Sequence, residues 1–465
     1  MKMTLNIGTS SPICAIATAP GGAIGIIRIS GSGCLDMVSN IFTKNVGDAH
    51  GYTMHYGRIY APDNSEPIDD VLISAFRAPH SYTGEDAAEI SCHGSRYILQ
   101  RIMELLIQQG ARQALPGEFT QRAFLNGKMD LSQAEAVADL IASTNAATHR
   151  MAMSQLRGGV KQELSDLRDQ LLQLTTLMEL ELDFTDQDVE FADRTKLYNL
   201  SLEISQHIQH LADSFHTGNA LKNGIPVAII GAPNVGKSTL LNTLLHEDRA
   251  IVSELQGTTR DIIEDVIQIE GITFRFIDTA GIRRTRNQIE KMGIERSMQA
   301  AERAQIILLL SEPNVPFPDL RLKEEKPILR VINKCDHAMP SSSFLYHKKT
   351  ADQLIHISAI TGDGIPLLQR ALVHAAAIPE LAENETVISN LRHYEALTRA
   401  QESLQRVISG FAPIAPDGND GVPLPIDLIA QDLRECLHHL ATITGSEITN
   451  DEVLGSIFRN FCVGK

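Results

Sequence analysis

The octapeptide GAPNVGKS at residues 231–238 constrains the fold of this chain more than any other feature. It fits the pattern GxxxxGK[ST], follows the apolar run Val227–Ile230 and precedes the helix-like STLLNTLL, which is the context that a phosphate-binding loop requires. Glycines let backbone N–H groups surround phosphates, and the N-terminus of the following helix adds its dipole. We expect Lys237 to reach the β- and γ-phosphates of a nucleotide and Ser238 to bind Mg²⁺.

Two later motifs complete the nucleotide site: the first would serve Mg²⁺ and the γ-phosphate, and the second indicates the base. Asp278-Thr-Ala-Gly281 and Asn333-Lys-Cys-Asp336 each follow a short apolar run. Asp336 can accept two N–H bonds from a guanine edge, which adenine does not offer, so the predicted nucleotide is GTP. Ser358 and Ala359 would complete the base pocket. The candidate GTP-binding residues are Asn234, Val235, Gly236, Lys237, Ser238, Thr239, Ser253, Thr258, Thr259, Asp278, Thr279, Ala280, Gly281, Asn333, Lys334, Asp336, Ser358 and Ala359.

The region between the first two motifs bears on hydrolysis. Thr259, in GTTRD at 257–261, is the candidate second ligand of Mg²⁺. The residue after DTAG is Ile282, where small GTPases of the Ras type have the glutamine that orients the attacking water. Another group must therefore position the water. Asn234 can instead ligate a monovalent cation that supplies charge where an arginine finger would sit.

The hydrophobic periodicity changes along the chain and predicts several domains. Short apolar runs that alternate with helical stretches in residues 217–379 predict an inserted GTPase domain with a mainly parallel sheet. Residues 1–130 mix strand-like runs, glycine-rich turns and one helical stretch, which predicts an α+β domain. Residues 131–216 and 380–465 have the apolar spacing of packed helices. The predicted fold is multidomain, α+β and α/β, with one helical domain interrupted by the GTPase domain.

The formal charge of −16 over 465 residues lies almost wholly on the two helical segments. The net charges are −2 for 1–130, −8 for 131–216, +1 for 217–379 and −7 for 380–465, and this shared acidity favours one helical domain. A chain this acidic is not a general nucleic-acid binder, because phosphate contacts come from clustered Lys and Arg. Its apolar runs are far shorter than the ~18 residues that cross a bilayer. Six scattered cysteines without a CxxC pair favour a reduced, cytoplasmic protein.

Four flanking motifs give the chain a resemblance that covers all the predicted domains. They are GGAIGIIRISG, SYTGEDAAEISCHG, LPGEFTQRAFLNGKMDLSQAEAVADLI and the terminal FCVGK. With the GTPase motifs, they resemble the bacterial tRNA modification GTPase family MnmE (TrmE), of the TrmE-Era-EngA-YihA-Septin-like GTPases. The resemblance implies a homodimer that forms a heterotetramer with the FAD-dependent MnmG (GidA). It implies that an aminomethyl-type group, such as carboxymethylaminomethyl, is added to C5 of the wobble uridine of certain tRNAs.

The resemblance also implies cofactors and residue roles. A tetrahydrofolate derivative, 5,10-methylene- or 5-formyl-, would supply the carbon and would be bound by Arg28, Glu89, Lys128 and Lys465. The K⁺ ligands would be Asn234, Ser253, Leu255 and Thr258. Glu290 would be the catalytic residue that orients the attacking water through a second water. Cys462 is either a reactive thiol or a small apolar residue that docks the tail.

Other interpretations stay open from the residues alone. Without the resemblance, Arg28 would be a solvated strand residue and Glu290 a solvated helix residue. A ribosome-assembly GTPase acting on rRNA would have the same GTPase motifs, but its flanks would be basic, whereas these are acidic. A folate-dependent transferase acting alone would need a nucleophile or base constellation, which residues 1–130 do not display. APGGAIG and HGS are departures from the family pattern near the expected folate site.

Overall fold

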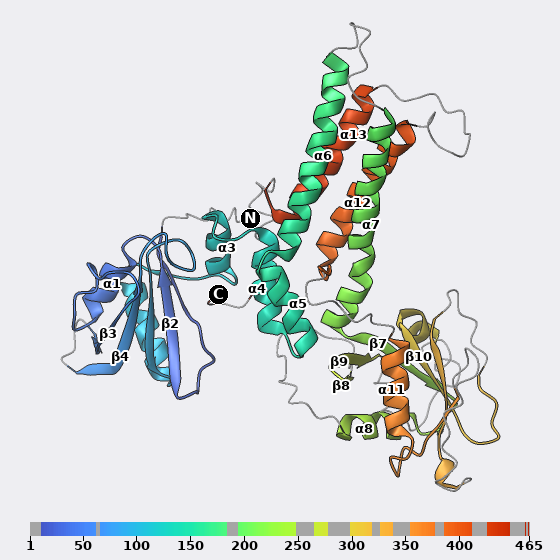
Figure 1. Ribbon diagram of the computed structural model, residues 1–465. Helices are drawn as coiled ribbons and strands as arrows, with labels where there is room; N and C mark the ends of the chain where they lie inside the picture. The colour runs from blue at the N-terminus through green and yellow to red at the C-terminus, as the bar shows by residue number, and fades with distance from the viewer. Residues whose placement is uncertain are drawn as a thin grey trace, which may run out of the picture. The chain divides into compact units, whose positions relative to one another are not determined.

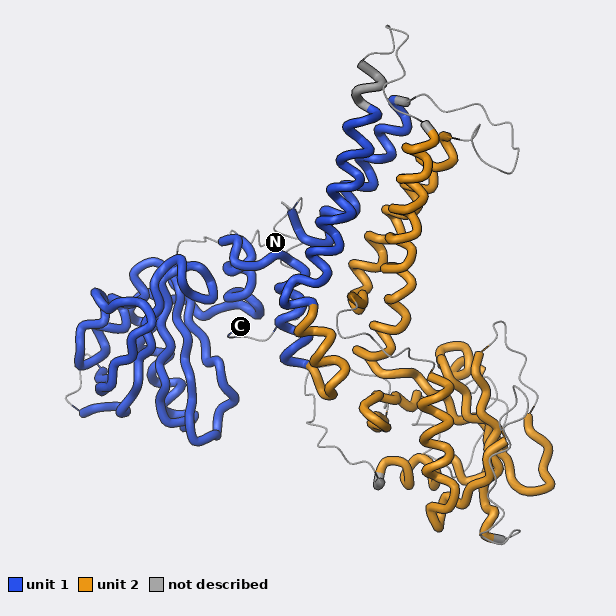
Figure 2. The backbone as a smooth tube through the Cα atoms, viewed as in Figure 1, with its two compact units in different colours: residues 1–142, 155–189, 426–465 blue, residues 143–154, 190–425 orange. Residues whose placement is uncertain are grey.

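The computed structural model describes residues 11–61, 66–183, 194–247, 265–277, 298–318, 326–337, 354–376, 386–411 and 426–446, together with Phe461 and Gly464 (Figure 1). The chain divides into two compact units (Figure 2). The first comprises residues 1–142, 155–189 and 426–465, and the second comprises residues 143–154 and 190–425. None of the described helices is long and apolar enough to cross a membrane.

The first unit contains a six-stranded sheet of order β3-β4-β5-β2-β1-β6. Its strands are β1 (Ile13–Ile16), β2 (Ile24–Ser30), β3 (Thr53–Tyr60), β4 (Pro67–Phe76), β5 (Ala87–His93) and β6 (Arg112–Gln113). Neighbouring strands are antiparallel, except that β1 and β6 are parallel. The α+β prediction for this part of the chain is confirmed.

Helices α1 (Cys34–Ile41) and α2 (Arg96–Gln108) pack on one face of this sheet. Successive side chains of a strand point to opposite faces. Ile27 and Ile29 of β2 are therefore buried against the helices, and Arg28 lies on the other face. The register of β2 with β5 places Glu89 opposite Arg28. The strand pattern thus puts two charged residues side by side on the face that α1 and α2 leave uncovered.

Helices complete the first unit. They are α3 (Glu118–Leu125), α4 (Leu131–Ala142), α6 (Gly159–Asp183) and α13 (Ile426–Thr444), and α5 (Ala146–Leu156) spans the boundary between the units. The apolar residues that recur three or four positions apart along α6, from Val160 to Leu174, are buried, and α6 packs against α13. The predicted helical stripe of this segment is confirmed.

In the second unit, α7 (Arg194–Asn223) packs against α12 (Leu391–Gly410). Helices from residues 131–216 and from residues 380–465 occur in both units, because α6 pairs with α13 and α7 pairs with α12. The predicted grouping of these two stretches into one helical domain, with the boundaries given above, therefore stays a prediction.

The second unit contains a six-stranded sheet of order β12-β11-β10-β7-β9-β8. Its strands are β7 (Ile225–Gly231), β8 (Asp265–Ile269), β9 (Ile272–Phe276), β10 (Ile306–Ser311), β11 (Ile328–Ile332) and β12 (Leu354–His356). The neighbouring pairs are parallel except β8 and β9. The predicted mainly parallel sheet is confirmed, and its central strands coincide with the apolar runs.

Strand β8 was not predicted, because its sequence DVIQI is short and mixed rather than a continuous apolar run. It forms a hairpin with β9 through Glu270 and Gly271, which have φ angles of 50° and 80°. Two consecutive positive φ angles are typical of the tight turns that join antiparallel strands. Helices α8 (Lys237–Glu247) and α11 (Ile365–Ala375) pack against the sheet, and the loops at the carboxyl ends of β7, β11 and β12 carry the predicted motifs.

Candidate functional site

The phosphate-binding loop runs from the end of β7 to Lys237, the first residue of α8. Asn234 and Gly236 have left-handed backbone conformations, with φ angles of 66° and 92°. A Cβ atom on Gly236 would collide with the side chain of Asn333, so this position requires glycine. The loop is therefore packed closely against the segment that follows β11.

Lys237 lies across this loop. Its Nζ donates to the carbonyl oxygens of Gly231 and Ala232, each at 2.8 Å. Burial lowers the pKa of Lys237, because the charged ammonium is partly removed from water. Phosphate oxygens beside this ammonium would favour its charged form again. The lysine, the loop and the N-terminus of α8 thus fit the phosphates of a nucleotide.

Asn333 connects the loop to the base-recognition motifs. Its Nδ2 donates to the carbonyl of Val235 at 2.8 Å, and its Oδ1 accepts from the N–H of Ala359 at 2.9 Å. Asn333 is buried. Oγ of Ser358 donates to Oδ1 of Asp336 at 2.8 Å. The structure therefore brings NKCD, the Ser-Ala pair after β12 and the phosphate-binding loop together at one edge of the sheet.

The other predicted residues of this site divide into two groups. Ser238 and Thr239 lie in the first turn of α8, and Lys334 has a φ angle of 64° and pairs with Glu312 at 2.5 Å. The side chain of Asn234 is exposed at the loop. The predicted positions that lie outside the described residues are Ser253, Leu255, Thr258, Thr259, Asp278, Thr279, Ala280, Gly281 and Glu290, and in the tail Cys462 and Lys465.

A second candidate site lies on the face of the N-terminal sheet opposite α1 and α2. Nε and Nη2 of Arg28 both donate to Oε1 of Glu89, at 3.0 and 2.7 Å. The guanidinium also lies 5.5 Å from the ring centre of Tyr82 and 5.7 Å from that of Phe119. A cavity of about 160 Å³ adjoins the pair. It is lined by Arg28, Ser30, Phe76, Tyr82, Thr83, Ala87 and Glu89.

The end of the chain reaches this pair. Nη1 of Arg28 donates to the carbonyl of Gly464 at 3.2 Å. Gly464 has a φ angle of 95°, and a Cβ there would lie 2.7 Å from the carbonyl oxygen of Ile16, so the tail fits only with glycine at this position. Lys128, predicted beside Arg28 and Glu89, does not line the cavity. Its Nζ donates to the carbonyl of Pro79 at 2.9 Å instead.

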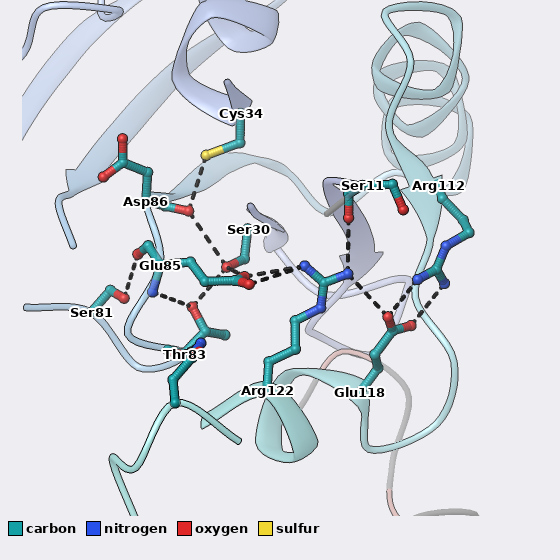
Figure 3. A network of polar contacts seen from close by, with 11 residues as sticks. Ser11, Ser30, Cys34, Ser81, Thr83, Glu85, Asp86, Arg112, Glu118 and Arg122 are labelled. Carbon is teal, nitrogen blue, oxygen red and sulfur yellow. Dashed lines mark hydrogen bonds and ion pairs between the residues drawn. The ribbon is translucent and has the colours of Figure 1, made fainter. Parts of the chain in front are cut away.

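Figure 3 shows a network of polar contacts that includes the cavity residues Ser30 and Thr83 and several buried or partly buried charged residues. Arg122 of α3 donates to both carboxylate oxygens of Glu85, at 3.3 and 3.2 Å, and to Glu118 at 3.2 Å. Glu118 also receives a bond from Arg112 at 2.9 Å. The side chains of Arg122 and Glu118 are only 3% and 1% exposed. Ser30, which lines the cavity, donates to Glu85 at 2.9 Å, so the network ends at the cavity wall.

Sequence reasoning did not single out Ser30, Thr83, Glu85 or Arg122. Their side-chain contacts join residues 37 or more apart in the sequence, and the one local bond runs from the backbone N–H of Glu85 to Oγ1 of Thr83. The sequence did indicate buried polar groups in the segments SYTGED and PGEFTQR, where polar residues lie beside apolar ones. Such segments suggest buried polar groups, but they do not say which partner satisfies them.

Glu118 should make stability depend on pH. Burial alone would raise the pKa of Glu118, but hydrogen bonds from Arg112 and the Leu115 N–H, with the charges of Arg112 and Arg122, outweigh burial and lower it. A lowered carboxyl pKa contributes stability above the ordinary pKa of about 4.3, and this stability is lost as pH falls through the lowered value. Glu118→Gln should therefore reduce the free energy of unfolding by ~3 kcal/mol near neutral pH.

Calorimetric unfolding of both proteins from neutral pH to below pH ~4 checks this prediction. The difference between wild type and variant should shrink at the acidic end. Glu104→Gln is the matched control, because it breaks an exposed pair with Arg101 and should change stability little. A Glu118→Gln effect that stays constant over the whole range would show that the carboxylate charge is not its cause.

Two family models and the curated relatives match nearly the whole chain. The family described as the GTP-binding protein TrmE N-terminus matches residues 12–128, and the MnmE helical domain matches residues 131–462. The tRNA modification GTPase MnmE of Bacteroides fragilis is 52% identical over 472 residues, which cover 97% of this chain and 99% of the relative. That of Flavobacterium johnsoniae is 46% identical over 478 residues, with the same coverage. Among solved structures, the G domain of the T. maritima FeoB iron transporter covers 33% of this chain and 98% of its own, at 22% identity and a TM-score of 0.23.

Proposed function

This chain belongs to the MnmE family of tRNA modification GTPases, and from that membership we propose that it hydrolyses GTP in the modification of tRNA. The observation that carries the GTP part is the pair of hydrogen bonds through which Asn333 joins the phosphate-binding loop to Ala359. Together with the hydrogen bond from Ser358 to Asp336, these bonds support one site that would include the carboxylate of Asp336 and the ammonium of Lys237. Phosphate binding and guanine recognition can then act on one nucleotide.

The remaining GTPase chemistry is proposed on the same basis. Mg²⁺ would be held by the hydroxyls of Ser238 and Thr259 together with the phosphates. K⁺ would be held by Asn234, Ser253, Leu255 and Thr258, and would supply charge at the transferred phosphate. Glu290 would orient the attacking water, since Ile282 cannot. The predicted GTP ligands from Asp278 to Gly281 would complete the part of the site that binds the phosphates.

We propose further that the cavity beside Arg28 and Glu89 binds a tetrahydrofolate derivative, which when bound supplies the one-carbon unit. The chemistry of the lining fits part of such a ligand. A carboxylate such as Glu89 accepts from the N–H groups of a pterin edge, and aromatic rings such as Tyr82 cover its flat face. Lys465 would follow directly after Gly464, whose carbonyl contacts Arg28. Lys128 would act from the adjoining loop.

The full proposal is a cytoplasmic homodimer that works with a FAD-dependent partner, MnmG (GidA), as a heterotetramer. Together they would add an aminomethyl-type group, such as carboxymethylaminomethyl, to C5 of the wobble uridine of certain tRNAs. GTP hydrolysis would drive conformational change rather than the carbon transfer itself. The membership in the family supports this assembly, as does the presence of both candidate sites in one chain.

Mass spectrometry of tRNA wobble uridines tests the proposal. Cells without the gene should lose the C5 substituent from these uridines, and a plasmid copy should restore it. A copy with Asp336→Asn should fail to restore it, because guanine recognition is removed. Unchanged wobble nucleosides together with an altered ribosomal subunit profile would overturn the proposal in favour of a ribosome-assembly GTPase.

A further inference from the structure

We propose that Glu85, held by Arg122, positions the hydroxyl groups of Ser30 and Thr83 so that this wall of the cavity accepts hydrogen bonds from a ligand and donates none. The inference rests on the proposed function, because it concerns the same cavity and the same folate-type ligand. It adds the residues that determine which edge of the ligand this wall recognises.

The direction in which each hydroxyl group donates its proton follows from the atoms that surround it. Oγ of Ser30 lies 2.9 Å from Oε2 of Glu85 and 3.5 Å from the carbonyl of Asp86. The first oxygen accepts from Arg122 and the second is a backbone carbonyl, so both are acceptors and the single hydroxyl proton of Ser30 points toward them. Oγ of Ser30 also lies 2.7 Å from Oγ1 of Thr83, and this bond must use the proton of Thr83. Both protons are therefore committed, and only lone pairs remain for a ligand.

Arg122 fixes the carboxylate that sets this direction. Its Nη1 contacts both oxygens of Glu85, and its Nη2 donates to the carbonyl of Ser11 at 2.9 Å and to Glu118 at 3.2 Å. The guanidinium is almost fully buried, so these contacts replace water. A planar guanidinium holds several acceptors at fixed angles, which an ammonium group does not. The orientation of Glu85 therefore depends on the shape of Arg122 as well as on its charge.

The loop that carries Thr83 is held from the other side. Nδ2 of Asn126 donates to the carbonyl of Thr83 at 2.7 Å, and the N–H of Glu85 donates to Oγ1 of Thr83 at 3.3 Å. Gly84 has a φ angle of 78°, and a Cβ there would lie 3.1 Å from Cβ of Asn126. The loop thus packs directly on the chain after α3. Thr83 has little freedom to turn its hydroxyl away from Ser30.

The wall formed by Ser30 and Thr83 consequently has one chemical character. Ser30 and Thr83 offer lone pairs, and Glu89 nearby offers a carboxylate. The donors of this lining lie apart from the wall, on Arg28, which commits three of its five N–H groups to Glu89 and Gly464. A ligand edge rich in N–H donors, such as that of an amino-substituted heterocycle, satisfies this wall. A carbonyl or carboxylate edge at the same place would face lone pairs and be rejected.

Titration calorimetry of the full chain with 5-formyltetrahydrofolate tests the inference. Thr83→Val keeps the size of the side chain but removes the hydroxyl, and should weaken binding about tenfold. Thr83→Ser keeps the hydroxyl and should bind within about twofold of wild type. Arg122→Lys keeps the charge but not the planar contacts, and should also weaken binding about tenfold. Thermal unfolding of each variant reports whether it folds.

Arg101→Gln is the control, since Arg101 lies on α2, pairs with Glu104 at the surface and is outside the cavity lining. Weak binding by Thr83→Val with rescue by Thr83→Ser supports the inference even if Arg122→Lys does not fold. If wild type binds the probe and Thr83→Val binds equally well, the inference is wrong while the folate proposal stands. If wild type does not bind the probe, the folate proposal fails and this inference fails with it.

Discussion

Asp336→Asn should weaken GTP binding about a thousandfold, because it replaces two charge-assisted hydrogen bonds, each worth about 1.5–3 kcal/mol, by one neutral bond and one contact between two donors. The carboxylate can accept from both donors of the guanine edge, whereas an asparagine presents one acceptor and one donor. The donor then faces an N–H group of guanine. In xanthine a carbonyl replaces the amino group, so the same variant should bind XTP more tightly than wild type does. Fluorescence titration with labelled GTP and XTP measures both changes.

A gain of XTP binding by Asp336→Asn would show that the variant is folded and has lost only its recognition of guanine. Ser358 donates to Oδ1 of Asp336, and an asparagine oxygen can still accept that bond. Asp363→Asn is the matched control, because Asp363 is exposed in the same region and accepts from Thr361 at 2.7 Å. It should leave both affinities unchanged. A loss of GTP binding by Asp336→Asn without any gain for XTP would mean that Asp336 does not contact the base.

The sheet of the second unit could be predicted because the hydrophobic pattern that marks its strands is contained within each strand's own sequence. Most residues of β7 and all residues of β10 are buried, so apolar runs mark these strands without any knowledge of their partners, and β11 is an apolar run interrupted only by Arg330. The motif residues follow these strands directly, and the carboxyl ends of parallel strands meet at one edge. Proximity of Asp336 to the phosphate-binding loop therefore follows from the strand pattern. The connecting role of Asn333 does not, because it depends on its side-chain rotamer.

The cavity of the N-terminal sheet could be predicted only in part. Arg28 and Glu89 were proposed by resemblance, but their ion pair follows from the register of β2 with β5, which strand periodicity leaves open. The bond between Arg122 and Glu85 joins residues 37 apart in sequence. Charged residues are read as solvated by default. Only the fold shows that Arg122 is buried and that Glu85 is partly buried.

Hydrolysis should fall about tenfold or more when Na⁺ replaces K⁺, because a charge at the transferred phosphate accounts for a factor of about 10³–10⁵ where an arginine finger supplies it. The proposed cation would supply this charge where an arginine finger would sit, while Glu290 would orient the water in place of Ile282. Asn234 is exposed at the phosphate-binding loop with a φ angle of 66°. Phosphate release in KCl and NaCl at equal ionic strength and constant Mg²⁺ measures the effect. GTP affinity should be similar in both salts, since the base and phosphate contacts do not use the cation.

The variant Asn234→Gly tests whether the Asn234 side chain causes the dependence of hydrolysis on K⁺. Glycine adopts the left-handed conformation without strain, so the variant removes the amide oxygen while keeping the loop. Its hydrolysis rates in K⁺ and Na⁺ should become equal. Asn314→Gly is the matched control, because Asn314 has a φ angle of 63° in the same unit and should keep the full K⁺ dependence. Equal rates in both salts for wild type would contradict the cation site, whereas loss of GTP affinity in Asn234→Gly would assign this residue to the structure of the loop.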